Sequence, residues 1–275
     1  MTPQTSTLAP SVAPTLRQAV RAEFHRVRQP PFETLITVAV NGALMSSAWF
    51  FLPTKLRDAI FTLHGTLAFA LVLAAWMYSD VPSTNVLGPD AGLALVALGD
   101  RVAFRRLLFA KSVALWLLIT PVCLIVAVVN GVWHHSLLST LFTAVWIGVV
   151  PFGMLGITNL VGIRFPYHPI PLRARWAFRR PIRHKLVRWV ILIVLPYGLT
   201  PVVGVAIMVP SLLIWGFTSP HGLSGHIPNN HVGLGVAVAC VIAVACAAIG
   251  HRLAWWIAQR RHDALVAYLR DPTRG

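Results

Sequence analysis

Carboxylates serve as general acids and bases, as metal ligands and as ion-coupling groups, and this chain of 275 residues has only eight of them. They are Glu23, Glu33, Asp58, Asp80, Asp90, Asp100, Asp263 and Asp271. None falls inside one of the long apolar runs, whereas ion-coupled carriers commonly place carboxylates at membrane depth. The sequence therefore argues against a proton- or sodium-coupled carrier, an intramembrane aspartyl protease and a carboxylate-bound metal catalyst.

Other reactive groups are sparse or spaced without a recognisable pattern. No G-x-S-x-G, H-E-x-x-H or G-x-x-x-x-G-K-[ST] motif occurs. Neutral imidazoles can bind zinc or copper, but the histidines expected on the outer side match no tight ligand spacing: His134, His135, His221, His226 and His231. The three cysteines lie within apolar runs and are interpreted as small packing residues: Cys123, Cys240 and Cys246. We expect no catalytic residue and no metal site in this chain.

The amino-acid composition indicates which class of protein this chain belongs to. Hydrophobic residues make up 56% of the chain and charged residues 11%, against about 25% charged in soluble domains. The apolar residues come in blocks of about 20 or more, which is the length of a membrane-spanning helix. We therefore expect an all-α integral membrane protein with six transmembrane helices: Thr34–Leu52, Ala59–Ser79, Leu107–Val129, Leu137–Ile163, a fifth beginning near Val187, and Val232–Ile257.

The placement of lysine and arginine orients these spans. All but two of the 23 lie on one side of the predicted membrane, and the exceptions are Lys55 and Arg57. Positive residues accumulate on the cytoplasmic side of membrane proteins. The sequence thus predicts a multi-pass protein of the cell membrane with both termini cytoplasmic. Its domains are a cytoplasmic segment (1–32), a six-span domain (33–258) and a cytoplasmic tail (259–275).

The most basic stretch, Arg164 to Trp189, raises the question of nucleic-acid binding, because it interleaves arginines with aromatic residues. The predicted topology makes it a cytoplasmic loop between two spans, where cations anchor to anionic headgroups. The net charge of +15 is also spread over four cytoplasmic segments and forms no single face. We expect contact with membrane lipids and no nucleic acid; an acidic protein partner is the alternative.

Two short helices are predicted on the cytoplasmic side. Pro14 to Gln29 is amphipathic, with an apolar face and arginines on the other side, and is expected to lie in the headgroup plane; a simple cytoplasmic helix is the alternative. That apolar face consists of Leu16, Val20, Phe24 and Val27. The second helix is GPDAGLALVALGD, with Asp90 near its start and Gly99 as its stop.

The fifth and sixth spans have unusual composition. Prolines and glycines interrupt the fifth, so we expect a helix to about Val203 followed by a segment that dips back from the outer face; one long kinked helix is the alternative. The prolines that suggest an outer gate there are Pro196, Pro201 and Pro210. The sixth span repeats small residues every four positions, which favours close helix packing within the chain or with another copy: Gly235, Ala239, Ala243 and Ala247.

This layout resembles the permease subunits of type-2 ABC exporters. The closest local similarity is Asp80 to Lys111, where an acidic, small-residue loop leads to a short helix, a basic turn and a lysine at the start of span three. Those features are Asp90 to Asp100, then Arg105-Arg106-Leu107-Leu108, then Lys111. The N-terminal amphipathic elbow, the six spans and the broken fifth span complete the resemblance.

The resemblance implies a mechanical role with no cofactor in this chain. A separate ABC-type ATPase subunit would carry ATP and Mg²⁺, and a second permease copy or paralogue would complete the pathway for an amphipathic or lipid-like substrate. The ATPase would dock on the loop that holds Asp90, Leu93, Val96, Asp100, Arg101, Arg105 and Arg106. The alternative functions are a non-catalytic membrane scaffold or accessory subunit, and a membrane enzyme acting on lipids.

Overall fold

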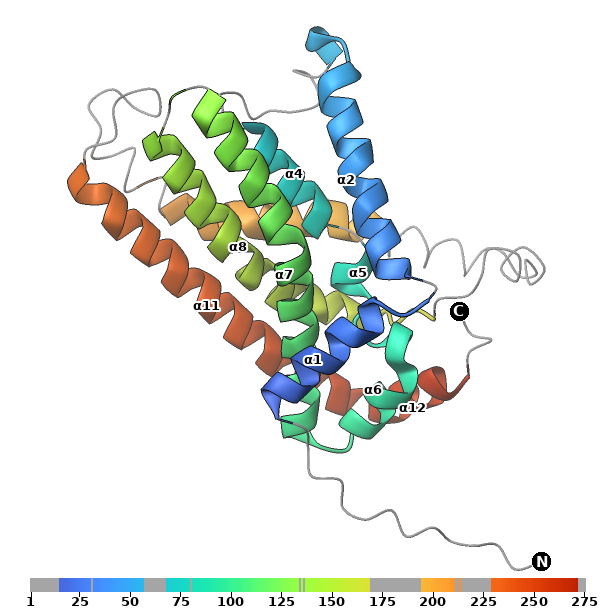
Figure 1. The fold of residues 1–275 in the computed structure, drawn as a ribbon. Coiled ribbons are helices and arrows are strands. Elements are labelled where there is room, and N and C mark those ends of the chain that lie inside the picture. The colour runs from blue at the N-terminus through green and yellow to red at the C-terminus, as the bar shows by residue number, and fades with distance from the viewer. Residues whose placement is uncertain are drawn as a thin grey trace, which may run out of the picture.

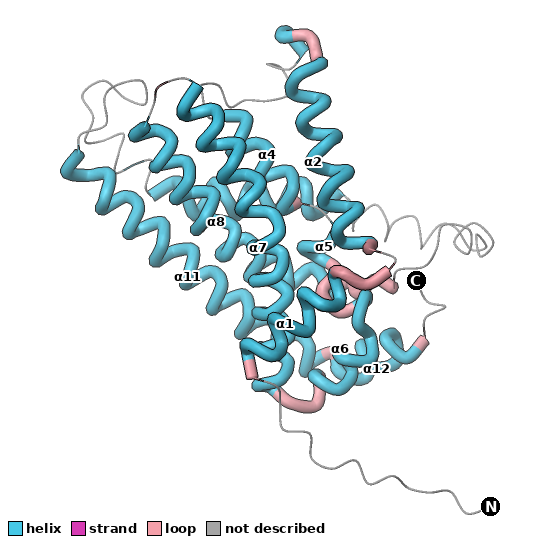
Figure 2. Tube along the Cα trace, in the orientation of Figure 1, coloured by secondary structure: helices cyan, strands magenta, loops and turns pink. Residues whose placement is uncertain are grey.

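The computed structural model describes residues 15–30, 32–56, 68–79, 81–133, 135, 137–168, 194–210, 213 and 229–271. Over these residues the chain forms helices, turns and loops without a β-strand, so the predicted all-α class is confirmed (Figure 2). The labelled helices are α1 (Leu16–Val27), α2 (Glu33–Phe51), α4 (Ala68–Tyr78), α5 (Val81–Thr84), η1 (Gly88–Asp90), α6 (Ala91–Ala97), α7 (Arg101–Trp133), α8 (Leu137–Arg164), α11 (Asn229–Arg260) and α12 (His262–Arg270).

Four helices within the described part are long and apolar enough to cross a membrane. They contain Thr34–Phe51 of α2, Arg101–Trp133 of α7, Thr140–Arg164 of α8 and Gly233–Arg260 of α11. Their positions agree with the predicted first, third, fourth and sixth spans. Shorter apolar helices occupy the other two positions, α4 for the second span and Val194–Pro210 for the fifth. The neighbouring residues 57–67 and 169–193 lie outside the described part, and so does most of the basic stretch.

The helix of the fifth span does not end near Val203, so that boundary is wrong. It continues from Val194 to Pro210 and includes Pro196 and Pro201. Packing supports it on one side, because the ring of Tyr197 lies 4.8 Å from that of Trp76 and Ile207 is buried. Neighbouring helices can stabilise a proline-containing helix in this way. Except for residue 213, the predicted re-entrant part lies outside the described residues.

The long helices form a bundle in which α8 packs between α7 and α11 (Figure 1). The apolar core of the bundle combines α4, α7, α8 and the Val194–Pro210 helix. Leu73, Ile119, Leu155 and Ile207 are each at most 2% exposed in this core. Many apolar side chains on the outside of α2, α7 and α11 remain exposed, as expected for a surface that faces lipid.

The small residues of the sixth span pack within this chain, against α8. A Cβ atom built on Gly250 would lie 2.2 Å from the carbonyl oxygen of Gly156, and one built on Gly156 would lie 2.5 Å from the Cα of Ala247. Ala239 and Ala243 are 4% and 0% exposed. The stripe that the sequence predicts therefore lets two backbones touch, and its partner is another helix of this chain.

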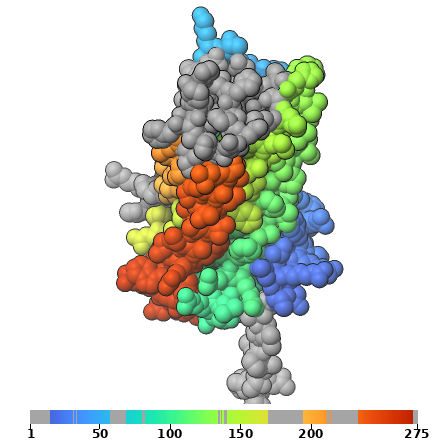
Figure 3. Space-filling view, turned by 90° about the vertical axis from the view of Figure 1, so that its left-hand side faces the viewer, coloured from blue at the N-terminus to red at the C-terminus, as the bar shows by residue number. Residues whose placement is uncertain are grey.

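The helices α1, α6 and α12 lie together at one end of the bundle, where α7 begins and α8 and α11 end (Figures 1 and 3). A second apolar core joins this end. It includes Leu98 of α6's C-cap, Phe104 of α7, Ile163 of α8, Ala254 of α11 and Leu265 of α12. Helix α11 ends at Arg260 and α12 follows it, so the segment predicted as the cytoplasmic tail (259–275) contains a packed helix.

Candidate functional site

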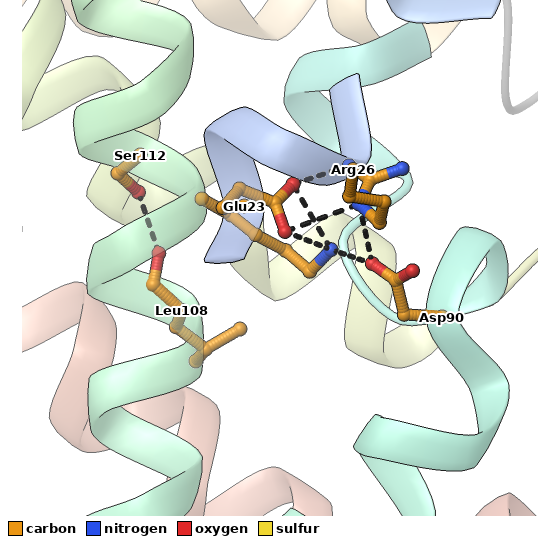
Figure 4. Close-up of polar contacts among 6 residues, drawn as sticks. Glu23, Arg26, Asp90, Leu108 and Ser112 are labelled. Carbon is orange, nitrogen blue, oxygen red and sulfur yellow. Dashed lines mark hydrogen bonds and ion pairs between the residues drawn. The ribbon is translucent and has the colours of Figure 1, made fainter. Parts of the chain in front are cut away.

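Four charged side chains from three separate elements meet at this end of the bundle (Figure 4). We call Glu23, Arg26, Asp90 and Lys111 the ion cluster. Glu23 and Arg26 belong to α1, Asp90 ends η1 just before α6, and Lys111 lies in α7. The Nζ of Lys111 lies 3.2 Å from Oε2 of Glu23, and the Nε of Arg26 lies 2.8 Å from Oδ2 of Asp90. Arg26 also pairs with Glu23, and Lys111 with Asp90.

The cluster is buried and its charges balance. The side chains of Lys111, Glu23 and Asp90 are 5%, 7% and 11% exposed, and that of Arg26 is 26% exposed. Burial by itself raises the pKa of Glu23, but the hydrogen bond from Arg26 and the positive charges of Lys111 and Arg26 hold that pKa below its ordinary value of 4.5. Glu23 thus stays ionised between the two cations.

Helix α1 is built to present this charged face. It starts with a capping box in which Thr15 accepts a hydrogen bond from the backbone N–H of Gln18 and the Gln18 side chain accepts one from the N–H of Thr15. Glu23 and Val27 are its buried residues. Leu16 of the predicted apolar face is 41% exposed, and Glu23 makes the ion pair of α1 with α7. The position of α1 in the headgroup plane stays a prediction.

Lys111 is the last charged residue before the long apolar stretch of α7. The helix has 33 residues, which is about 50 Å at 1.5 Å per residue. No charged residue occurs from Ser112 to Trp133, and this stretch is roughly 30 Å long, about the thickness of the hydrocarbon core. The first turns of α7 therefore extend beyond that core, and the ion cluster lies where the apolar stretch begins.

Helix α6 has one buried side and one exposed side. Ala94, Ala97 and the following Leu98 are buried in the second core. Leu93 and Val96 are 58% and 69% exposed. The predicted short helix is thus present, with its α-helical part from Ala91 to Ala97, and two of its apolar residues face outward.

The other residues predicted for this loop have different surroundings. Asp100 caps α7, accepting hydrogen bonds from the backbone N–H groups of Val102 at 2.9 Å and Ala103 at 3.3 Å. Arg101 and Arg105 are exposed beside α6, whereas Arg106 is half-buried. Asp90, by contrast, points into the ion cluster. Of the residues predicted for this loop, Asp90 therefore faces the interior of the protein, whereas Leu93, Val96 and Arg101 face outward.

The prolines predicted to form an outer gate lie in the Val194–Pro210 helix. Pro196 is buried, and Pro201 and Pro210 are half-buried. In the sequence they lie far from the residues of the ion cluster. They remain a prediction about the fifth span.

Helix α12 packs on the buried side of α6. The Nε2 of His168 donates to the carbonyl oxygen of Tyr268 at 3.0 Å, and the two rings stack with centroids 4.8 Å apart. The side chain of Gln259 donates to the carbonyl oxygen of Leu98 at 3.2 Å. The apolar spacing of Leu265, Val266 and Leu269 in the tail is a signal that could have predicted this helix.

A second polar group lies inside the bundle and could not be predicted from spacing. Nδ2 of Asn159 donates to Oγ of Ser112 at 3.2 Å and lies 3.3 Å from Nε2 of His251. These residues come from α8, α7 and α11 and are each at most 6% exposed. They satisfy one another's hydrogen bonds where three helices meet, which is the usual role of polar side chains between membrane helices.

Comparison with protein-family models, with curated proteins and with solved structures finds no match to this chain. Among the residues that the structure describes, no group of three or more histidine, cysteine or acidic side chains is arranged to hold a metal ion. The function of the chain is therefore inferred from the geometry of the bundle end where α1, α6 and α12 lie.

Proposed function

We propose that this chain is the permease subunit of an ATP-driven exporter of the type-2 ABC class. It moves an amphipathic or lipid-like substrate outward across the cell membrane. In this proposal α4 and the Val194–Pro210 helix belong to the second and fifth of six spans, and α1 is the elbow helix at the cytoplasmic surface. A second copy or a paralogue completes the pathway, and a separate ATPase subunit hydrolyses ATP with Mg²⁺.

The exposed side of α6 carries this proposal. Leu93 and Val96 project from a short helix whose other side is buried in the protein, at the end of the bundle where arginines accumulate. Arg101 and Arg105 follow them in the sequence, in the first turns of α7, and are also exposed. Apolar residues surrounded by charge are typical of a docking site, because a few buried apolar anchors carry most of the binding energy.

The attachment of α6 supports a mechanical role. Its buried side contacts α12 and α7, and α7 is one of the apolar helices long enough to cross the membrane. A partner that pushes on Leu93 and Val96 would therefore act on a body that includes a membrane helix. A docking loop that serves only as a tether would not need such packing.

The test is co-purification of an ATPase with the tagged chain from its native membranes. The double variant Leu93→Glu with Val96→Glu should lose the ATPase and transport-stimulated hydrolysis while remaining in the membrane, because charge would be buried in the interface. The matched control is Ala264→Glu with Ala267→Glu, which adds the same charge to the exposed side of α12. If no ATPase co-purifies with the wild-type chain, the scaffold alternative replaces the exporter.

A further inference from the structure

We propose that the ion cluster is a joint that fixes the N-terminal end of α6 to α7 and α1, so that Glu23, Arg26, Asp90 and Lys111 are positioning residues for that helix. The positioning is a property of this chain alone. That it serves the docking of an ATPase rests on the proposed function.

The two ends of α6 are held by different means. At the C-terminal end the chain continues through Leu98, which is 1% exposed, into α7, and Gln259 binds the carbonyl oxygen of Leu98. At the N-terminal end Gly88 packs so closely that an added Cβ would lie 1.5 Å from the carbonyl oxygen of Tyr167. Asp90 then pairs with Lys111 and Arg26 just before α6 begins. The helix is thus anchored at both ends, with its outer side free.

The cluster forms a closed ring of alternating charge. Glu23 contacts Arg26, Arg26 contacts Asp90, Asp90 contacts Lys111, and Lys111 contacts Glu23 (Figure 4). Every charge therefore has two neighbours of opposite sign, and the ring has no net charge. Moving Asp90 away would separate it from two cations at once and leave buried charge without compensation.

The ring also joins parts that are far apart in the sequence. Lys111 and Glu23 are separated by 88 positions, and Lys111 and Asp90 by 21. Helix α1 supplies one acid and one base, so it neutralises Asp90 and Lys111 together. A displacement of the α6 N-terminus must consequently move α1 and the start of the apolar part of α7, or it must break the ring.

The experiment measures the distance between α6 and α7 in the purified chain in nanodiscs. Spin labels are placed at Gly92→Cys and Leu117→Cys after replacement of the three native cysteines. A Cβ at Gly92 meets no atom within 4 Å, and Leu117 is 42% exposed. The wild-type ring should give one narrow distance distribution by double electron–electron resonance. Asp90→Asn and Glu23→Gln should each broaden and shift it, whereas Asp263→Asn, on the exposed side of α12, should leave it unchanged.

A neutral double variant separates positioning from folding. Asp90→Asn with Lys111→Gln removes one acid and one base, so it should recover much of the thermal stability that either single change loses, while the distance distribution stays broad. The joint is overturned if Asp90→Asn keeps the wild-type distribution or if the double variant restores it. Neither measurement includes an ATPase, so a failure of the proposed function would leave these results intact, and a failure of the joint would leave ATPase co-purification intact.

Discussion

Glu23 and Asp90 are neutralised by the same two cations, so these acids hold helices together and are not free for chemistry. The sequence indicates that no acid lies inside a span, and the structure agrees for Glu23 in α1 and Asp90 in η1. The sequence does not predict, however, that Glu23 and Asp90 lie in one cluster. Because both carboxylates are paired, the cluster does not favour the alternative of a membrane enzyme.

The pH dependence of stability should report the state of Glu23. Its pKa is lower in the folded protein than its ordinary value of 4.5, so its ionised form stabilises the fold above about pH 4.5. That contribution is lost as the pH falls below 4.5 and through the lower folded pKa. Glu23→Gln should therefore lower the melting temperature at pH 7. On acidification its melting temperature should fall less than that of the wild type. Thermal unfolding of the detergent-purified chain from pH 7 to pH 3 measures both effects.

The control for that measurement is Asp263→Asn, because Asp263 is exposed on α12 and belongs to no described ion pair of the cluster. It should follow the wild-type curve at every pH. If Glu23→Gln also follows the wild-type curve, the ion pairs of Glu23 contribute nothing measurable to the fold.

Only half of the cluster could be anticipated from the sequence. The resemblance to type-2 exporters singles out Asp90 and Lys111, but as separate landmarks. Glu23 and Arg26 look like ordinary polar residues of an amphipathic helix, and nothing in their spacing identifies partners 88 positions away. The contact depends on how α1 packs on α7, which is a tertiary property.

At the scale of elements, the packing of α8 on α11 depends on contact between two backbones. Gly250→Ala should strongly destabilise the bundle, because the new Cβ would lie 2.2 Å from the carbonyl oxygen of Gly156 and the helices would have to separate. Gly233→Ala in the same helix is the matched control, since its Cβ meets no atom within 4 Å. Thermal unfolding compares the two. Equal melting temperatures would show that the close approach does not limit stability.

Helix α12 should stabilise α6 through its buried side. Leu265 is 1% exposed in the second core, so Leu265→Ala should cost about 2–5 kcal/mol of stability. The change should also make the α6 end more sensitive to limited proteolysis in membrane fragments, where the protease reaches both sides of the membrane. Ala267→Ser, on the exposed side of α12, should change neither property. Unaltered proteolysis of Leu265→Ala would mean that α6 keeps its place without α12.

The elements were predictable to different degrees for physical reasons. The long helices were predictable because uninterrupted apolar runs leave few alternatives, and α8 begins at Leu137 as predicted. The break near Val203 was not found, because neighbouring side chains support a helix despite Pro196 and Pro201. Helix α12 was not predicted because the four arginines of the tail (259–275) hide a short apolar stripe.

For the whole molecule, the orientation and the internal arrangement have different origins. The charge bias on its own predicts which end faces the cytoplasm. It does not predict that α6, α7 and α12 share a second core at that end, since this arrangement depends on contacts between residues such as Phe104 and Leu265. The charge distribution thus predicts the orientation of the bundle in the membrane. The packing of the helices forms the exposed side of α6 on which the proposed function depends.

Labelling in intact cells tests the orientation on which that function depends. Gly92 lies in α6 at the basic end, and Trp133 is 80% exposed at the opposite end of α7. In a background that lacks the native cysteines, Trp133→Cys should react with a membrane-impermeant thiol reagent, and Gly92→Cys should react only after the cells are opened. An ATPase can reach Leu93 and Val96 only from the cytoplasm, where ATP is available. The reverse labelling pattern would place α6 outside the cell, and docking of an ATPase on this helix would then be impossible.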